Sequence, residues 1–254
     1  MTVALVLSPH PDDELIGCPA HLYALRDAGW RVVNLAISLG SLRERRAERR
    51  AELTAACASA GFELVFASPE LESAATERDA PGATAAVVAL ARELGAELIA
   101  APSPHDAHPL HEFVGTVAVD AVRVGAAPRL WLWSLWGPMP LVNSICTYEP
   151  RRLNEIDRAL KCHAGEVARA DLPRLLRARA EADSVLLAER AFGFGGRRDI
   201  GTLAEGVLEV LPGPAGLRMS APAIFDPRSM AREATGPAID GWLSAPSARS
   251  LADG

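Results

Sequence analysis

The residues with the clearest chemical potential are histidines and aspartates in two short segments. The first is Ser8-Pro9-His10-Pro11-Asp12-Asp13-Glu14, and the second is His105-Asp106-Ala107-His108-Pro109-Leu110-His111. Together they hold four of the six histidines of the chain. Zinc takes imidazole nitrogen and carboxylate oxygen ligands, and a catalytic zinc site uses three protein ligands with one open position. The two segments therefore predict a metal site with two histidines and one aspartate.

The spacing within each segment supports this prediction but leaves alternatives open. His10 and Asp13 are three residues apart across an expected strand-to-helix turn, so both can point at one spot. His108 and His111 have the same spacing at a helix start, where both need not bind. Asp12 or Asp13 could instead cap the following helix, and a lone histidine is more often structural than a ligand.

The elements that must position these segments alternate between strand and helix. Short apolar runs predict strands at 3–8, 31–38, 63–67, 96–101, 129–135 and 145–148, and helical spacing predicts helices at 14–28, 42–60, 84–94, 112–124 and through 150–192. This pattern predicts an α/β fold, Rossmann-like, with a mainly parallel sheet and helices on both faces. Ligands bind such sheets at the carboxyl ends of the strands. The two segments follow the first and fourth strands, so they are expected to meet there.

The composition changes near residue 212. We expect one domain over residues 1–211 and a C-terminal extension over 212–254, which is rich in Pro, Ala, Gly and Ser. Phe225 and Trp242 are the residues most suited to pack this extension against the domain.

Composition argues against several classes of protein. The 254-residue chain has a formal net charge of -6, which does not suit a nucleic-acid-binding protein. No apolar run approaches the roughly 18 residues of a membrane span, and residues 1–8 lack a basic leader, so a cytoplasmic location is expected. The four cysteines have no CxxC spacing and are expected to be reduced.

The first segment, with Gly17 after it, resembles the (A/S)HPDDE signature of the PIG-L/LmbE-like zinc-dependent N-deacetylase family. The second signature of that family, HxxH, has its counterpart in His108 and His111. Weaker similarities are Arg49-Arg50-Ala51-Glu52-Leu53 to an R-x-x-E-L helix, and short segments at 159–166 and 204–206. The resemblance covers roughly residues 3–207, in the family's order.

The resemblance implies a role for each matching residue. It implies that His10, Asp13 and His111 bind Zn²⁺, or Fe²⁺ or another divalent ion in its place. It implies that Asp12 is the general base toward the metal-bound water and that His108 polarises the substrate carbonyl. One position departs from the family, because Leu110 stands where an aspartate often lies between the two histidines. That aspartate can orient the first histidine, so the departure bears on His108, for which Asp106 could be a substitute partner.

The expected function is removal of an N-acetyl or other N-acyl group from a small amino-sugar-containing metabolite. Arg49, Asp106 and Trp136 are candidate substrate contacts. The alternatives are an amidase of thiol or sugar conjugates and a non-catalytic metal-binding protein of the same fold. The expected partner is a small N-acetylated molecule, with neither nucleic acid nor membrane, and a homo-oligomer is compatible with the sequence.

Overall fold

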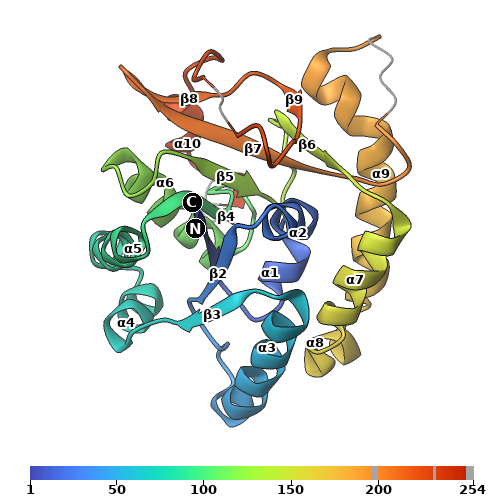
Figure 1. The fold of residues 1–254 in the computed structure, drawn as a ribbon. Coiled ribbons are helices and arrows are strands. Elements are labelled where there is room, and N and C mark those ends of the chain that lie inside the picture. The colour runs from blue at the N-terminus through green and yellow to red at the C-terminus, as the bar shows by residue number, and fades with distance from the viewer. Residues whose placement is uncertain (196–199, 231–232, 250–254) are drawn as a thin grey trace.

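The computed structural model describes residues 1–195, 200–230 and 233–249, which form a nine-stranded sheet with helices around it (Figure 1). The sheet order is β3-β2-β1-β4-β5-β7-β6-β9, with β8 paired to β7. The strands are β1 (Val3–Ser8), β2 (Arg31–Ala36), β3 (Glu63–Phe66), β4 (Ala96–Pro102), β5 (Leu130–Trp133), β6 (Ser144–Thr147), β7 (Ala204–Gly213), β8 (Gly216–Met219) and β9 (Ala223–Ile224).

Strands β1 to β5 are mutually parallel and set the position of the site. Strand β1 lies between β2 and β4, pairing Val3 with Arg31 on one side and Leu5 with Ile99 on the other. The chain leaves β1 toward β2 and returns to β4 on the opposite side. A doubly wound sheet has its ligand crevice at such a reversal of strand order, outside the carboxyl ends of the strands. The loops after β1 and β4 flank this crevice.

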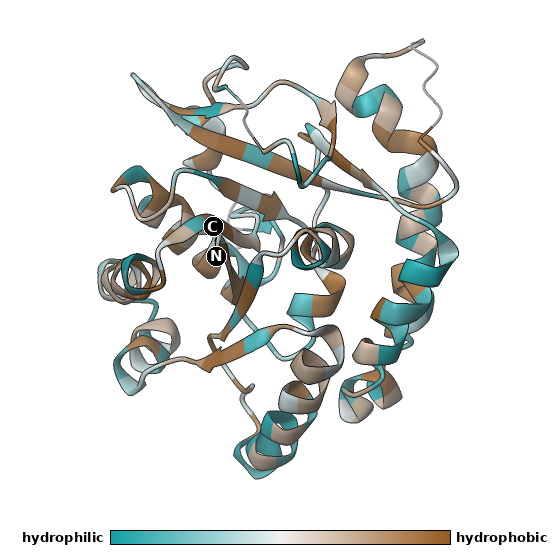
Figure 2. Cartoon of the chain, in the orientation of Figure 1, coloured by the Kyte–Doolittle hydropathy of each residue, from teal (hydrophilic) through white to brown (hydrophobic). Residues whose placement is uncertain are grey.

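The helices cover both faces of the sheet, as Figure 1 shows. They are α1 (Asp13–Ile16), α2 (Pro19–Asp27), α3 (Arg46–Ala60), α4 (Pro69–Glu77), α5 (Ala80–Leu94), α6 (Pro109–Arg123), α7 (Pro150–Leu160), α8 (Ala164–Arg169), α9 (Leu172–Phe192) and α10 (Asp240–Leu243), with a 3₁₀ turn η1 (Arg43–Arg45). One apolar core joins the sheet to α4, α5 and α6, and a second joins it to α1, α2, α3, α7 and α9. The strands are mostly hydrophobic and the outer helix faces mostly hydrophilic (Figure 2). Among the described residues, no helix is long and apolar enough to cross a membrane.

The fold class predicted from the sequence is confirmed, and the differences are local. The helix expected over 14–28 is broken into α1 and α2 at Gly17 and Cys18. A Cβ on Gly17 would lie 2.6 Å from Cε2 of Trp133, so the break lets β5 pack closely against this turn. Helix α4 was not expected, although Ser68 caps it by accepting a hydrogen bond from the Leu71 amide.

The C-terminal residues are more ordered than the loose extension that was expected. Strand β7 runs antiparallel between β5 and β6, β8 pairs with it, and β9 pairs with β6. Phe225 and Trp242 pack against opposite cores of the domain. The expected boundary at 211/212 lies within β7, and the division into two units stays a prediction.

Candidate active site

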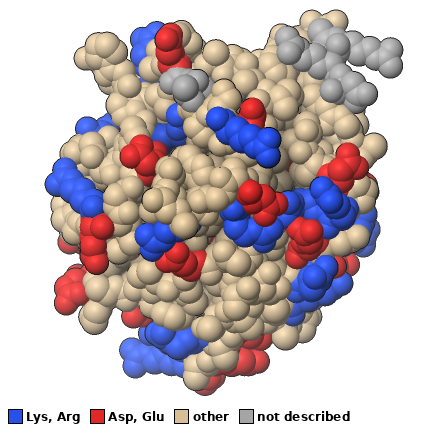
Figure 3. Space-filling view, viewed as in Figure 1, with Lys and Arg blue, Asp and Glu red and all other residues tan. Residues whose placement is uncertain are grey.

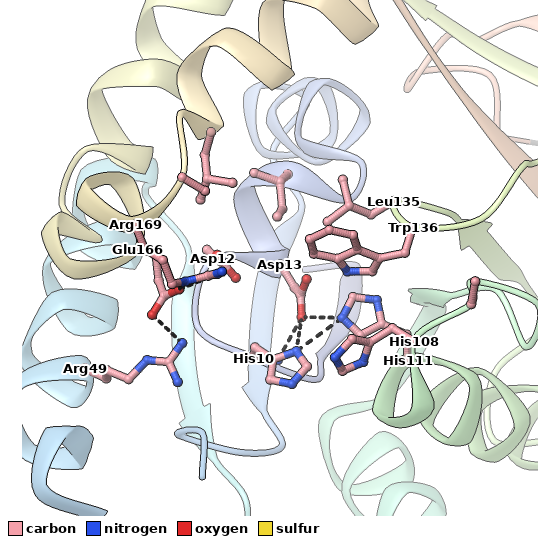
Figure 4. Close-up of a pocket in the computed structure, with 14 residues that line it drawn as sticks. His10, Asp12, Asp13, Arg49, His108, His111, Leu135, Trp136, Glu166 and Arg169 are labelled. Carbon is pink, nitrogen blue, oxygen red and sulfur yellow. Dashed lines mark hydrogen bonds and ion pairs between the residues drawn. The ribbon is translucent and has the colours of Figure 1, made fainter. Parts of the chain in front are cut away.

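Two loops at the carboxyl ends of β1 and β4 bring the chemistry-bearing residues together. His10 and Asp12 lie in the loop after β1, and Asp13 begins α1. His108 precedes α6, and His111 lies in the first turn of that helix. Figure 4 shows both sets of side chains facing one cavity. The parallel order of β1 and β4 thus joins two segments that are far apart in sequence.

Three side-chain atoms form a nearly equilateral triangle. His10 Nδ1 lies 3.2 Å from His111 Nε2, and Asp13 Oδ2 lies 3.3 Å from each of these nitrogens. Ligands that bind zinc tetrahedrally at 2.0–2.1 Å are about 3.3 Å apart. The three atoms are therefore spaced as one face of a zinc coordination tetrahedron, and the residues fit a small divalent ion.

A second grouping of the same region contains three histidines. One ligand nitrogen from each of His10, His108 and His111 lies within 4.8 Å of the other two. The limit of 4.8 Å is longer than the 3.2–3.3 Å distances in the triangle that includes Asp13. The Asp13 carboxylate also supplies negative charge, which three neutral imidazoles lack. We therefore favour His10, Asp13 and His111 as the ligand set, with His108 beside it.

Asp106 orients His111 from behind. The Asp106 side chain is fully buried, and its Oδ2 lies 2.6 Å from His111 Nδ1. Its Oδ1 accepts hydrogen bonds from the Ser134 hydroxyl and from the backbone amides of residues 135–137. A carboxylate on the outer nitrogen of a metal-binding histidine fixes its tautomer and orientation. The expectations that Asp106 contacts the substrate or partners His108 are wrong, because both of its oxygens are already bonded elsewhere.

Electrostatics at the triangle favour positive charge. Burial would lower the pKa of His111, but Asp13 and Asp106 outweigh it and raise the pKa to about 10. Burial likewise raises the pKa of Asp13, but His111 and His10 outweigh it and hold the pKa below its ordinary value. Two buried carboxylates around one imidazole thus stabilise a cation at this position.

Asp12 is free of the triangle and is placed to handle a proton. Its backbone has φ of 112°, and its side chain lies on the Glu166 side of Asp13 (Figure 4). Burial, with Asp13 and Glu14 close by, raises the pKa of Asp12 well above its ordinary value. Its carboxylate forms no hydrogen bond to any other residue that the structure describes. A carboxylate of raised basicity beside the metal-ligand triangle suits a general base.

Glu14 and His163 were not singled out from the sequence and support Asp12. Glu14 Oε2 accepts a hydrogen bond of 3.1 Å from the Asp12 amide, and Glu14 Oε1 lies 2.7 Å from His163 Nε2. Both side chains are fully buried. Glu14 was visible as the last letter of the first signature, but its partner lies 149 residues away.

His108 lacks the partner that the family aspartate would supply. Its Nδ1 is buried and has no hydrogen-bond partner among the described residues. Leu110 packs against the core instead of turning toward it. Burial, with His111 and His10 nearby, lowers the pKa of His108 to about 4, so its imidazole is neutral at neutral pH. The ring of His108 lies 4.8 Å from that of His10, beside the triangle.

The cavity over the triangle has a volume of about 490 Å³, within the range of small-molecule sites. Arg49 lines one side, where its Nη2 lies 2.7 Å from Glu166 Oε1. Trp136 lines the other side, half-exposed, with its ring 6.3 Å from that of His108. A Cβ on Gly165 would lie 1.7 Å from Arg45 Nη2. Arg49 and Trp136 thus both line the cavity, and their contact with a substrate stays a prediction.

The comparisons with known proteins agree with this fold. A family model described as GlcNAc-PI de-N-acetylase, PIG-L, matches residues 5–122. A search among curated proteins gave no match. A conserved protein from Thermus thermophilus is 20% identical, with 91% of this chain and 100% of that chain covered at a TM-score of 0.62.

Two further solved structures carry functional names. The zinc-inhibited form of teicoplanin deacetylase Orf2 is 14% identical, covering 82% of this chain and 98% of that chain at a TM-score of 0.60. GalB, the 4-carboxy-2-hydroxymuconate hydratase from Pseudomonas putida KT2440, is 20% identical, covering 84% and 98% at a TM-score of 0.59. At these identities the three structures establish a shared fold.

The class of protein follows from these observations: a doubly wound α/β chain with a histidine–aspartate cluster at its strand-order reversal. Within that class, residues 5–122 match the family model of PIG-L. The two signature segments at 8–14 and 105–111 both lie inside the matched range.

Proposed function

We propose that the protein is a metal-dependent hydrolase that removes an N-acetyl or other N-acyl group from a small amino-sugar-containing molecule. The observation that carries this proposal is the triangle of His10, Asp13 and His111 on the wall of a cavity, with the free carboxylate of Asp12 next to it. The family model is named for de-N-acetylation and the teicoplanin enzyme for deacetylation, which supports the reaction type.

The metal is proposed to be Zn²⁺, with Fe²⁺ as an alternative. His10, Asp13 and His111 would hold it, and Asp106 would keep the His111 ring in place. When bound, a divalent ion supplies Lewis acidity toward the carbonyl and lowers the pKa of a coordinated water to about 7. The spacing of the three ligand atoms supports this proposal, and the identity of the ion is left to elemental measurement.

The remaining steps belong to side chains of this chain. Asp12 accepts the proton of the attacking water and returns it to the leaving nitrogen, so that a carboxylic acid and an amine are the products. His108, as a neutral imidazole, donates an N–H hydrogen bond to the carbonyl oxygen as negative charge develops on it. Arg49 and Trp136 contact the sugar. The N-acylated sugar is the only partner molecule that this mechanism requires besides water and the metal. A cytoplasmic location and a homo-oligomer stay predictions.

Replacing Asp12 by asparagine tests the proposal. Asparagine tolerates a positive φ, so Asp12→Asn removes the base without backbone strain. Wild-type protein loaded with Zn²⁺ should convert members of a panel of N-acetylated amino sugars to free amines, detected by mass spectrometry. The variant should bind the same amount of metal and lose about 10²–10⁴-fold in turnover. Full activity of the variant would show that Asp12 is not the general base. A wild-type protein that binds no metal would contradict the proposal.

A second candidate is addition of water to an unsaturated carboxylate, which the shared fold with the hydratase supports. Both reactions need an activated water and a base, so the triangle and Asp12 serve either. Incubation with 4-carboxy-2-hydroxymuconate, followed by mass spectrometry for gain of one water, separates them. Hydration without any deacetylation would favour this candidate.

A further inference from the structure

A second cavity adjoins the first, and most of the residues that line it have no role in the chemistry described above. Its volume is about 610 Å³, and it shares His10, Arg49 and His108 with the first cavity. His10, one corner of the triangle, therefore lies where the two cavities meet. The walls of the second cavity come from the segment after β2, the start of α3, the end of α4 and the start of α6. We call it the arginine-lined cavity.

Its charge differs from that of the molecule as a whole. Four arginines line it, Arg43, Arg46, Arg49 and Arg78, with Glu72 as the one lining acid among the described residues. The chain carries a formal net charge of -6, and on the face seen in Figure 3 basic and acidic side chains are interspersed. The arginine-lined cavity is thus a concentration of positive charge in an acidic protein.

Two of the four guanidinium groups have no carboxylate partner. Arg46 Nη1 lies 2.8 Å from Glu72 Oε1, and Arg49 is paired with Glu166. Within the described part of the chain, neither Arg43 nor Arg78 forms an ion pair. Arg78 instead lies with its guanidinium 5.3 Å from the centre of the Phe113 ring. The cavity therefore has positive charge that the described residues do not neutralise.

The backbone holds the other two arginines in place along the wall. Arg46 Nε donates to the Gly40 carbonyl at 3.3 Å, and Arg49 Nη1 donates to the Leu39 carbonyl at 3.1 Å. Gly40 has φ of 87°, and a Cβ there would lie 1.8 Å from Arg49 Nη1. The Nε of Arg49 is buried without a partner. The carbonyls of this glycine turn thus hold both guanidinium groups, and Arg49 is the arginine that lines both cavities.

We propose that the arginine-lined cavity binds an anionic group, a phosphate or a carboxylate, of the molecule whose N-acyl group lies at the triangle. Guanidinium groups bind both anions through paired, charge-assisted hydrogen bonds. Arg43 and Arg78 supply the uncompensated charge. This inference rests on the proposed function and narrows its substrate to N-acylated amino sugars that carry an acidic substituent.

The test compares neutral and anionic N-acetylated sugars. N-acetylglucosamine is the neutral probe, its 1-phosphate and 6-phosphate carry phosphate, and N-acetylmuramic acid carries a carboxylate. Zinc-loaded wild-type protein should show a kcat/KM at least about tenfold higher for one anionic probe than for the neutral one. Arg43→Gln combined with Arg78→Gln should remove most of that preference. The phosphate and carboxylate arms show which anion the cavity takes.

A matched variant and a binding measurement complete the test. Arg177→Gln removes one exposed positive charge on α9, away from both cavities, and should leave the preference unchanged. Calorimetric binding of the same probes to the Asp12→Asn variant measures the preference without turnover. Equal binding and equal turnover of neutral and anionic probes would overturn the inference while leaving deacetylation standing. A preference that survives the double substitution would overturn it too. Absence of deacetylation with every probe would instead count against the proposed function, and the binding arm would still decide the inference.

Discussion

The loops after β1 and β4 face each other across one site, but they are held in different ways. In the β4 loop one buried carboxylate, Asp106, contacts the His111 ring with one oxygen. Its other oxygen accepts hydrogen bonds from a hydroxyl and from backbone amides. In the β1 loop Glu14 holds the Asp12 amide and is itself paired with His163, which comes from the turn between α7 and α8. Each loop contains a buried carboxylate–imidazole pair, but the carboxylate of the β4 loop also accepts from one hydroxyl and three backbone amides, whereas that of the β1 loop accepts from one amide.

The difference shows which groups each loop depends on. Removing a single neutral donor from Asp106 leaves its other interactions in place. Removing His163 leaves Glu14 buried with only one amide as partner. A buried carboxylate that has lost its counterpart is costly, whereas replacing both members of such a pair by apolar residues is often nearly neutral. The two loops should therefore respond differently to substitution.

The largest effect is expected at His163. His163→Leu should lower the free energy of unfolding by about 3–5 kcal/mol, because Glu14 loses its counterpart in a fully buried position. Urea unfolding of the metal-free protein measures this change. The pair Glu14→Leu and His163→Leu together should recover much of the loss but leave the Asp12 amide without its acceptor, so turnover should stay low. If the single and double variants lose the same free energy of unfolding, the pairing of Glu14 with His163 contributes little to stability.

Asp106→Asn should affect the metal more than the fold. An amide cannot accept from both His111 Nδ1 and the surrounding donors, so the ring loses its fixed tautomer. We expect metal affinity to fall about 10–100-fold, measured by competition with a chromogenic chelator. Asp157→Asn, on α7 and distant from the site, is the matched control. Unchanged affinity in Asp106→Asn would show that the β4 loop does not need this carboxylate.

The smallest effect is expected at Asp183, which lies near an arginine that supports both loops. Arg179 of α9 donates to the Ile16 carbonyl at 2.9 Å and to the Ser134 carbonyl at 2.7 Å, so it joins the end of α1 to the segment that bonds Asp106. Burial is the main reason that the pKa of neighbouring Asp183 rises from 3.8 to about 6, although Arg179 opposes it.

The sign of the resulting pH dependence follows from that shift. The folded chain binds the Asp183 proton more tightly than the unfolded chain, so this carboxyl lowers stability as the pH rises from about 4 to about 6. Asp183→Asn should match wild type near pH 4 and exceed it by about 1 kcal/mol at pH 7, a value reduced for partial exposure. Urea unfolding at both pH values measures the difference. A variant less stable than wild type at pH 7 would contradict this reasoning.

Much of the site could be anticipated because its ligands lie in two short segments next to strongly patterned strands. Val3–Ser8 and the run before Pro102 are continuous apolar stretches, which are typical of buried parallel strands. Polar residues after such strands fall at the carboxyl edge of the sheet. The positions of His10, Asp13 and His111 follow from this local reasoning.

Other features depended on packing between distant segments. The break at Gly17 exists because Trp133 occupies the space a side chain would need. Strand β7 was not expected from the sequence, and its pairing with β5 and β6 adds it to the sheet. Asp106 was recognised as a candidate but given the wrong contact, because sequence spacing does not show which of two nearby histidines a carboxylate faces.

The sequence by itself determined the fold class and the residue types at the metal-ligand triangle, because strand periodicity and ligand chemistry are local properties. Only the tertiary structure decided which side chains support these ligands. Glu14 meets His163 across 149 residues, and Arg179 reaches both Ile16 and Ser134. The same holds for the arginine-lined cavity, whose charges come from separate elements and become one surface only when those elements pack around the end of the sheet.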